Sequence, residues 1–137
     1  MRVVVVPGVP ALRPEYASIE DPVAELRAAV RAARAWLEED QDGLLLVANG
    51  SAKRTEKAPG HFDERAEGFD EELGAALASG DLDALRAIDV DLAAELLADV
   101  DALVGLGPLG EVTDVHVDYD DAPYGVQYWV VRYECAS

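Results

Sequence analysis

The sequence predicts an α/β fold with three layers, α/β/α, in which a mixed sheet has parallel N-terminal strands and a C-terminal antiparallel hairpin. Continuous apolar runs within residues 2–6 and 44–48 are typical of buried strands, and a segment of helical periodicity separates them. The C-terminal part instead alternates apolar and polar residues around a turn. Parallel neighbouring strands joined through a helix require a right-handed crossover, which defines the α/β class.

The first strand ends at Pro7 and leads into a proline-rich loop, residues 7–14. Such a loop stiffens the backbone at the strand end where α/β proteins place their sites. Asp21 followed by Pro22 has the form of a helix N-cap with proline in the first helical position. We therefore expect the first helix over residues 22–38.

This helix has two predicted faces. Apolar residues recur at helical spacing and should face the sheet: Leu26, Val30, Ala33 and Leu37. Three arginines share another face: Arg27, Arg31 and Arg34. We expect these arginines to form a solvated stripe near Glu25 and Glu38, because opposite charges on a helix surface favour this arrangement.

Three more helices should cover the sheet after the second strand. The first follows an apolar stripe: Phe62, Ala66, Phe69, Leu73 and Leu77. A short helix is expected at residues 81–88. The last follows another stripe before Gly105: Leu92, Leu96, Val100 and Leu103. The terminal hairpin should turn at residues 120–125 and continue as a strand over residues 126–133.

Composition narrows the classes of function. The 137 residues suit one domain, and 28 acidic against 11 basic residues give a net charge of −17. This charge repels phosphate backbones, so we expect no nucleic-acid partner. The run Val3–Val6 is too short for a membrane span or a signal-peptide core. A single cysteine, Cys135, excludes an intrachain disulfide and a cysteine metal cluster, which favours the cytoplasm.

Three stretches carry a resemblance to a known family. They are VVVVPGVPAL at residues 3–12, NGSAKRTEKAPG at residues 49–60 and YDDAPYGV at residues 119–126. In the same order, they resemble segments of uncharacterised bacterial proteins classed as LigB-like, which are related to the B subunit of class III extradiol ring-cleavage dioxygenases. The resemblance implies one shortened LigB-like α/β domain over residues 1–137, lacking a large segment between the first helix and the second strand.

The resemblance implies a scaffold without the family's iron site. The histidine ligand that follows the first strand in ring-cleaving members corresponds to Val9 here, and valine cannot bind a metal. The second active-site histidine, which follows a serine, corresponds to Ala52 after Ser51. A further ligand belongs to the central region that this chain lacks. The implied protein therefore has no catalytic residue and no cofactor, with iron bound only if it is nevertheless an enzyme.

Only two histidines are present, His61 and His116. A facial-triad iron site needs two histidines and a carboxylate at one point. A shared metal would require the hairpin that carries His116 to pack over the helix end near His61. Capping and surface roles are the alternative reading of these two residues.

The loop after the second strand is the most cationic part of the chain, with Lys53, Arg54 and Lys57 against Glu56. At the end of a strand in an α/β fold, it is suited to a small carboxylate or phosphate, with a bidentate contact from Arg54. The alternative is internal pairing with one or more of four carboxylates: Asp63, Glu64, Asp120 and Asp121. The sequence leaves both open.

Ser51 lies in neither a phosphate-binding loop nor a Gly-x-Ser-x-Gly elbow, so hydrolysis would need a spatial histidine partner. If the hairpin folds back towards this loop, Asp120 and Tyr124 would rim one pocket, and Tyr124 would stack on a planar ligand. We thus predict a non-catalytic LigB-like domain that binds a small anionic or aromatic molecule, or a protein partner. The predicted ligand-binding residues are Ser51, Lys53, Arg54, Lys57, His61, Asp120 and Tyr124.

Two alternatives remain from different classes. One is a metal-dependent extradiol-type dioxygenase that uses His61, His116 and a carboxylate, which predicts bound iron or another divalent metal. The other is a structural homo-oligomer, in its simplest form a homodimer, in which a second copy covers surface exposed by the missing segment.

Overall fold

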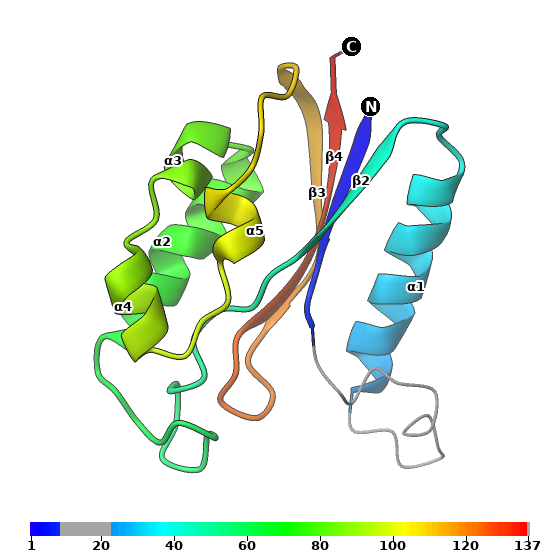
Figure 1. The fold of residues 1–137 in the computed structure, drawn as a ribbon. Coiled ribbons are helices and arrows are strands. Elements are labelled where there is room, and N and C mark those ends of the chain that lie inside the picture. Colours follow the sequence, from blue (N-terminus) through cyan, green and yellow to red (C-terminus); the bar gives the residue numbers. More distant parts are fainter. Residues whose placement is uncertain (9–22, 137) are drawn as a thin grey trace.

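The computed structural model describes residues 1–8 and 23–136. Within them, a four-stranded mixed sheet has the order β2-β1-β4-β3, with β1 parallel to β2 and the other pairs antiparallel. The strands are β1 (Arg2–Val6), β2 (Gly43–Val47), β3 (Val112–Asp121) and β4 (Tyr128–Cys135). Figure 1 shows this sheet nearly edge-on between two layers of helix. The predicted α/β class is confirmed.

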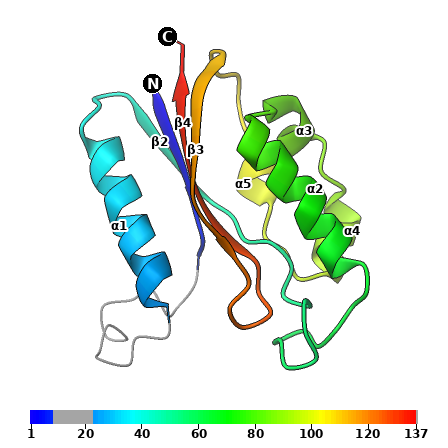
Figure 2. The same ribbon diagram turned by 180° about the vertical axis from the view of Figure 1, so that it is seen from behind.

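The two helical layers are unequal. Among the described residues, one face of the sheet is covered by a single helix, α1 (Ala24–Glu38). The other face is covered by α2 (Ala66–Ser79), α3 (Leu82–Arg86), α4 (Val90–Glu95) and α5 (Asp101–Val104). Figure 2 shows the same separation from behind. None of the helices in residues 1–8 and 23–136 is long and apolar enough to cross a membrane.

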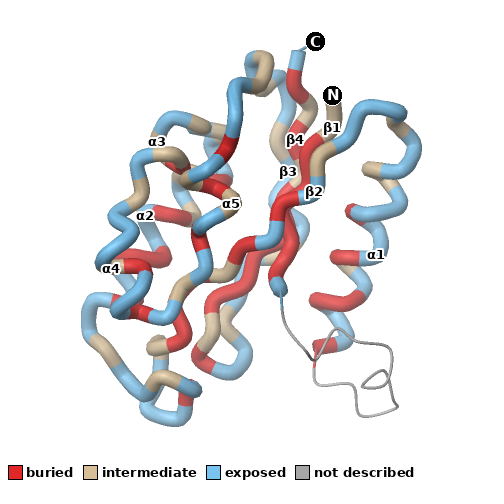
Figure 3. Tube along the Cα trace, in the orientation of Figure 1, coloured by how far each residue is buried: buried red, intermediate tan, exposed pale blue. Residues whose placement is uncertain are grey.

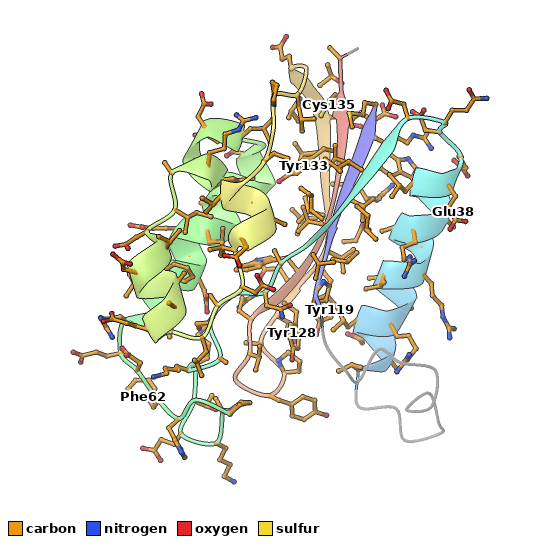
Figure 4. The ribbon with its side chains drawn as sticks, in the orientation of Figure 1. Glu38, Phe62, Tyr119, Tyr128, Tyr133 and Cys135 are labelled. Atoms are coloured by element: carbon orange, nitrogen blue, oxygen red, sulfur yellow. The ribbon has the colours of Figure 1, made fainter. Side chains whose placement is uncertain are left out.

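The central strand β1 is buried on both faces, which explains its continuous valine run. Val3 and Val5 belong to the larger core, between the sheet and α2 to α5, whereas Val4 and Val6 belong to the smaller core under α1. Figure 3 shows the buried positions of the helices on the sides that face the sheet. In the larger core, Tyr133 of β4 donates a 2.5 Å hydrogen bond from Oη to the carbonyl of Leu77 in α2, and it points into this layer in Figure 4.

The first helix and the second strand lie close to their predicted positions. Helix α1 begins at Ala24, and the predicted cap at Asp21 and Pro22 lies outside the described residues, as does most of the proline-rich loop. Strand β2 begins and ends one residue earlier than expected. The predicted arginine stripe is only partly correct: Arg31 and Arg34 are exposed, but Arg27 is 6% exposed.

The second helix begins later than the apolar spacing predicted. Phe62 is 59% exposed and lies outside α2, in the segment at the outer edge of Figure 4. The reason is local: His61 has a left-handed φ of 61°, and the Asp63 carboxylate accepts a 2.9 Å hydrogen bond from the Arg65 amide. These turns occupy the chain until Ala66, from where the predicted stripe is buried.

The predicted helix at residues 92–103 is wrong as one element. It is two short helices, α4 and α5, separated at Leu97, which has a φ of 60°. The backbone of Asp99 instead forms a two-way bridge with Asn49, with N–O distances of 2.9 and 3.1 Å. The apolar residues Leu96 and Leu103 are nevertheless fully buried. The helical spacing of apolar residues therefore predicted which residues are buried, but not the conformation of the backbone.

Candidate functional site

The loop after β2 lies against the end of the hairpin. Gly50 donates a 2.9 Å backbone hydrogen bond to Gln127, Gln127 donates one of 2.9 Å to Ser51, and the Arg54 amide donates one of 3.1 Å to Gly125. The hairpin therefore folds back onto the cationic loop, which is the arrangement that the predicted pocket required.

Gly125 allows this close approach. Its φ is 77°, and a Cβ atom at this position would lie 2.5 Å from Ala58 Cβ and 2.7 Å from Thr55 Oγ1. A residue with a side chain would be strained in this conformation and would push the hairpin from the loop.

Beneath this contact, a buried carboxylate holds the loop to α2. Asp70 accepts hydrogen bonds of 2.8 Å from the Ser51 amide and 2.7 Å from Ser51 Oγ. Both residues are buried, with Asp70 3% and Ser51 0% exposed. Burial raises the pKa of Asp70, although the hydrogen bonds from Ser51 and the charge of Arg54 act in the opposite direction. Ser51 thus orders the loop and is not accessible to a ligand.

Arg54 extends this network towards solvent. Its Nη1 atom lies 3.4 Å from Asp70 Oδ2 and 2.9 Å from Gln127 Oε1. Gln127 in turn donates a 2.7 Å hydrogen bond from Nε2 to Asp120 Oδ1. The internal partner of Arg54 is therefore Asp70, which was not among the four carboxylates considered from the sequence.

A cleft of about 650 Å³ opens where α2 faces the hairpin. Its polar and charged lining residues are Arg54, Thr55, Asp70, Glu71, Asp120, Asp121 and Gln127. Its remaining lining residues are small or aromatic: Gly74, Ala75, Ala78, Ala122 and Trp129.

Trp129 has an unusual environment in this cleft. Its indole Nε1 is buried and makes no hydrogen bond to any residue in the described part of the chain. Gly74 lies over it, because a Cβ atom at that position would be 3.3 Å from Nε1. A buried hydrogen-bond donor without an acceptor is uncommon in proteins.

A second hollow, of about 490 Å³, adjoins the cleft. Lys57 and Tyr124 line it, and it shares Thr55 and Ala122 with the cleft. Tyr124 is 54% exposed. The structure thus brings Arg54 and Asp120 to one cleft and Lys57 and Tyr124 to its neighbour.

Two predicted site residues lie elsewhere. His61 is exposed in the segment before α2 and lines neither hollow. Lys53 packs against Gly60, where a Cβ atom would lie 2.7 Å from its Cγ. Together with Arg65, whose hydrogen bonds have the larger effect, Lys53 lowers the pKa of Asp63 to about 2. Lys53 therefore acts on Asp63 and lies away from the cleft.

The two histidines are on opposite sides of the sheet. Val115 packs into the larger core, so strand alternation places His116 on the α1 face. His61 precedes α2, on the other face. His116 Nε2 lies 2.9 Å from Asp114 Oδ2, and no cluster of three or more metal-binding side chains occurs within residues 1–8 and 23–136. Val9 lies outside these ranges, and Ala52 is buried.

Sequence reasoning missed Asp70, Gln127 and Trp129 as parts of this site. Asp70 had a usable signal, because it lies four residues after Ala66 and three before Leu73, on the buried stripe of α2. A carboxylate on an apolar stripe must find partners when it is buried. No comparable local signal existed for Gln127.

Comparison of the sequence with protein-family models gives no match, and comparison with curated proteins gives none either.

Proposed function

We propose that this chain is a non-catalytic LigB-like domain that binds a small aromatic monoanion in the cleft between α2 and the hairpin. The main support for this proposal is that only part of the Arg54 guanidinium is hydrogen-bonded to the described residues. Its Nη1 atom is engaged by Asp70 and Gln127, whereas Nε and Nη2 make no hydrogen bond to the described residues. Its side chain is 27% exposed and lines the cleft. Two parallel N–H groups of a guanidinium suit a carboxylate.

The wall of the cleft supports a planar ligand. Gly74, Ala75 and Ala78 present little side chain on α2, and the indole of Trp129 lies against Gly74. These small residues leave room for a flat ring, which gains from burial.

The carboxylates of the cleft limit the charge of the ligand. Glu71, Asp120 and Asp121 line it together with Arg54. These groups disfavour a dianion and accept hydrogen bonds from amino or hydroxyl groups. The ligand class that fits is therefore an aromatic monocarboxylate with an amino or hydroxyl substituent.

The assignment to the LigB-like family and a cytoplasmic location are parts of the same proposal. The three LigB-like stretches support it, and two of them, residues 49–60 and 119–126, meet at the cleft. The proposal has no catalytic step, since Ser51 is buried and the LigB-like resemblance implies that Ala52 stands at the position of a family histidine. A cytoplasmic location is supported by the lone thiol, Cys135, which is buried.

The test is calorimetric titration and thermal unfolding with three probes: 4-aminobenzoate, benzoate and acetate. We expect the strongest binding with 4-aminobenzoate and the weakest with acetate. A ligand at 100 times its Kd should stabilise the fold by about 2.7 kcal/mol. The decisive variant is Arg54→Ala, which should abolish binding. Arg31→Ala is the matched control, because it removes the same charge from an exposed site on α1.

Tryptophan fluorescence gives an independent readout. In a Trp36→Phe background, Trp129 is the remaining tryptophan, and its emission should change when 4-aminobenzoate binds. The proposal would be refuted if no aromatic probe bound, or if Arg54→Ala bound the probe as tightly as Arg31→Ala.

A further inference from the structure

Strand β2 has an open edge within the part of the chain that the structure describes. At its two ends, the Arg2 amide donates a 3.1 Å hydrogen bond to the Asp42 carbonyl, and the Ala48 amide donates one of 3.0 Å to the Val6 carbonyl. The backbone groups of a strand alternate in direction, so the even-numbered residues of β2 face β1. Gly43, Leu45 and Val47 therefore direct their N–H and C=O groups away from the sheet. None of these three residues has a hydrogen-bond partner on that side among the described residues.

The side chains along this edge are apolar and exposed. Leu45 is 38% exposed and Val47 is 41% exposed. In the sheet register they lie beside Val4 and Val6, on the face that α1 covers. β2 contains no charged residue, no proline and no bulge. It lies at the front edge of the sheet in Figure 1.

The other edge strand, β3, is protected in ways that β2 is not. It carries four aspartates, Asp114, Asp118, Asp120 and Asp121, and its pairing with β4 has two register shifts. Charges and bulges on an edge strand prevent pairing with another chain. Protection of one edge and not of the other points to β2 as a surface for strand addition.

We propose that a second copy of this chain pairs antiparallel with β2 about a two-fold axis at Leu45. In this register, Leu45 faces the partner's Leu45, and Gly43 faces the partner's Val47. Every outward N–H and C=O group of the three residues then finds a partner, because all three are in hydrogen-bonded positions of the ladder. The free edge ends at the Asn49–Asp99 bridge, so the available length matches β2 itself.

Charge favours the antiparallel alignment. The turn before β2 is acidic, with Glu39, Asp40 and Asp42. Antiparallel pairing places the acidic turns of the two copies at opposite ends of the paired strands. A parallel pair would place the two acidic turns side by side, which is unfavourable. The inference is independent of the cleft, which lies at the hairpin side of the molecule.

Sedimentation equilibrium of the unmodified protein, over low to high micromolar concentration, tests the proposal. We expect a reversible monomer–dimer equilibrium. Val47→Lys should shift the protein to monomer, because a lysine on the edge opposes strand pairing. Val117→Lys is the matched control, since Val117 is 43% exposed on the other edge strand. It should leave the dimer intact, and circular dichroism should show that both variants are folded.

Disulfide cross-linking tests the register. Leu45→Cys places two thiols at the two-fold axis, where Cα atoms of a hydrogen-bonded pair are about 5.5 Å apart, within disulfide range. Val47→Cys places them four strand positions apart, roughly 13 Å, which is too far. Mild oxidation should therefore cross-link Leu45→Cys and not Val47→Cys. The parent chain contributes only the buried Cys135.

Three results would overturn the proposal. These are a wild-type protein that stays monomeric, a dimer that survives Val47→Lys, or cross-linking of Val47→Cys as efficient as that of Leu45→Cys.

Discussion

Ser51 Oγ donates a 2.7 Å hydrogen bond to Asp70 Oδ2, while the Ser51 amide donates one of 2.8 Å to Oδ1. One residue thus satisfies both oxygens of a carboxylate that is almost fully buried. This pair joins the loop after β2 to α2 and thereby positions Arg54, whose Nη1 atom reaches Asp70 Oδ2 at 3.4 Å.

Substitution Ser51→Ala should lower the free energy of unfolding by about 1–3 kcal/mol, because it leaves a buried acceptor without its closest side-chain donor. Urea unfolding followed by circular dichroism measures the change. Ser79→Ala is the control, since Ser79 is exposed and its hydroxyl donates one hydrogen bond among the described residues, to the Ala76 carbonyl at 3.2 Å. Its effect should stay within about 0.5 kcal/mol. Equal effects of the two substitutions would contradict a structural role for the Ser51–Asp70 pair.

Asp70 should also give a measurable dependence of stability on pH. Burial raises its folded-state pKa above the unfolded value of about 3.9. The folded state therefore holds this proton more tightly, and the stabilisation is fully present below the unfolded pKa and is lost as pH rises through the folded pKa. Relative to Asp70→Asn, the wild type should gain stability as pH falls from neutral towards 4.

Chemical unfolding of both proteins at several pH values measures this difference. Because all other titrating groups are shared, their contributions cancel. A difference between wild type and Asp70→Asn that stays constant with pH, or that moves in the opposite direction, would show that the pKa of Asp70 is not raised.

Gly125 and Gly68 should respond in opposite directions to alanine. Gly125→Ala introduces a side chain at a φ of 77°, 2.5 Å from Ala58 Cβ, and should destabilise the fold by at least about 1–2 kcal/mol. Gly68→Ala lies in α2 with no atom within 4 Å of the new Cβ, and should stabilise by up to about 1 kcal/mol. Thermal unfolding of the two variants is the measurement. Tolerance of Gly125→Ala would mean that the hairpin does not pack on the loop.

Tyr133→Phe should destabilise the protein by about 0.5–1.5 kcal/mol, because it removes the buried hydrogen bond to the Leu77 carbonyl. Burial raises the pKa of Tyr133 well above its usual range, so the phenol stays a donor at all pH values of the measurement. Tyr119→Phe is the matched control, as its hydroxyl makes no hydrogen bond to the described residues. Urea unfolding should place the control within about 0.5 kcal/mol of wild type.

Local patterns predicted most of the elements. The continuous valine run gave a central strand, because both faces of β1 are buried, and the alternation at residues 115–119 gave a hairpin strand. Patterns failed where backbone partners lie far away in the sequence. The helix expected at residues 92–103 is divided because Asp99 pairs with Asn49, 50 positions earlier in the chain.

The candidate site was predictable only in part. A cationic loop after a strand indicated Arg54, and the turn indicated Asp120, because charge and strand ends are visible locally. The bonds that hold them join residues from separate elements: Arg54 with Gln127, and Gln127 with Asp120. The carboxylate that pairs with Arg54 depends on how α2 packs against the loop. The hydrophobic periodicity of the sequence does not show this packing.

The sequence by itself determined the class of the fold, the two faces of its sheet and the acidic surface, since burial and charge are properties of each residue and of its near neighbours. Only the tertiary structure decided that Ser51 binds Asp70, that the Trp129 indole lies beneath Gly74 and that β2 is an edge strand within residues 1–8 and 23–136. Each of these results from elements that are distant in sequence and approach only when the two cores are packed.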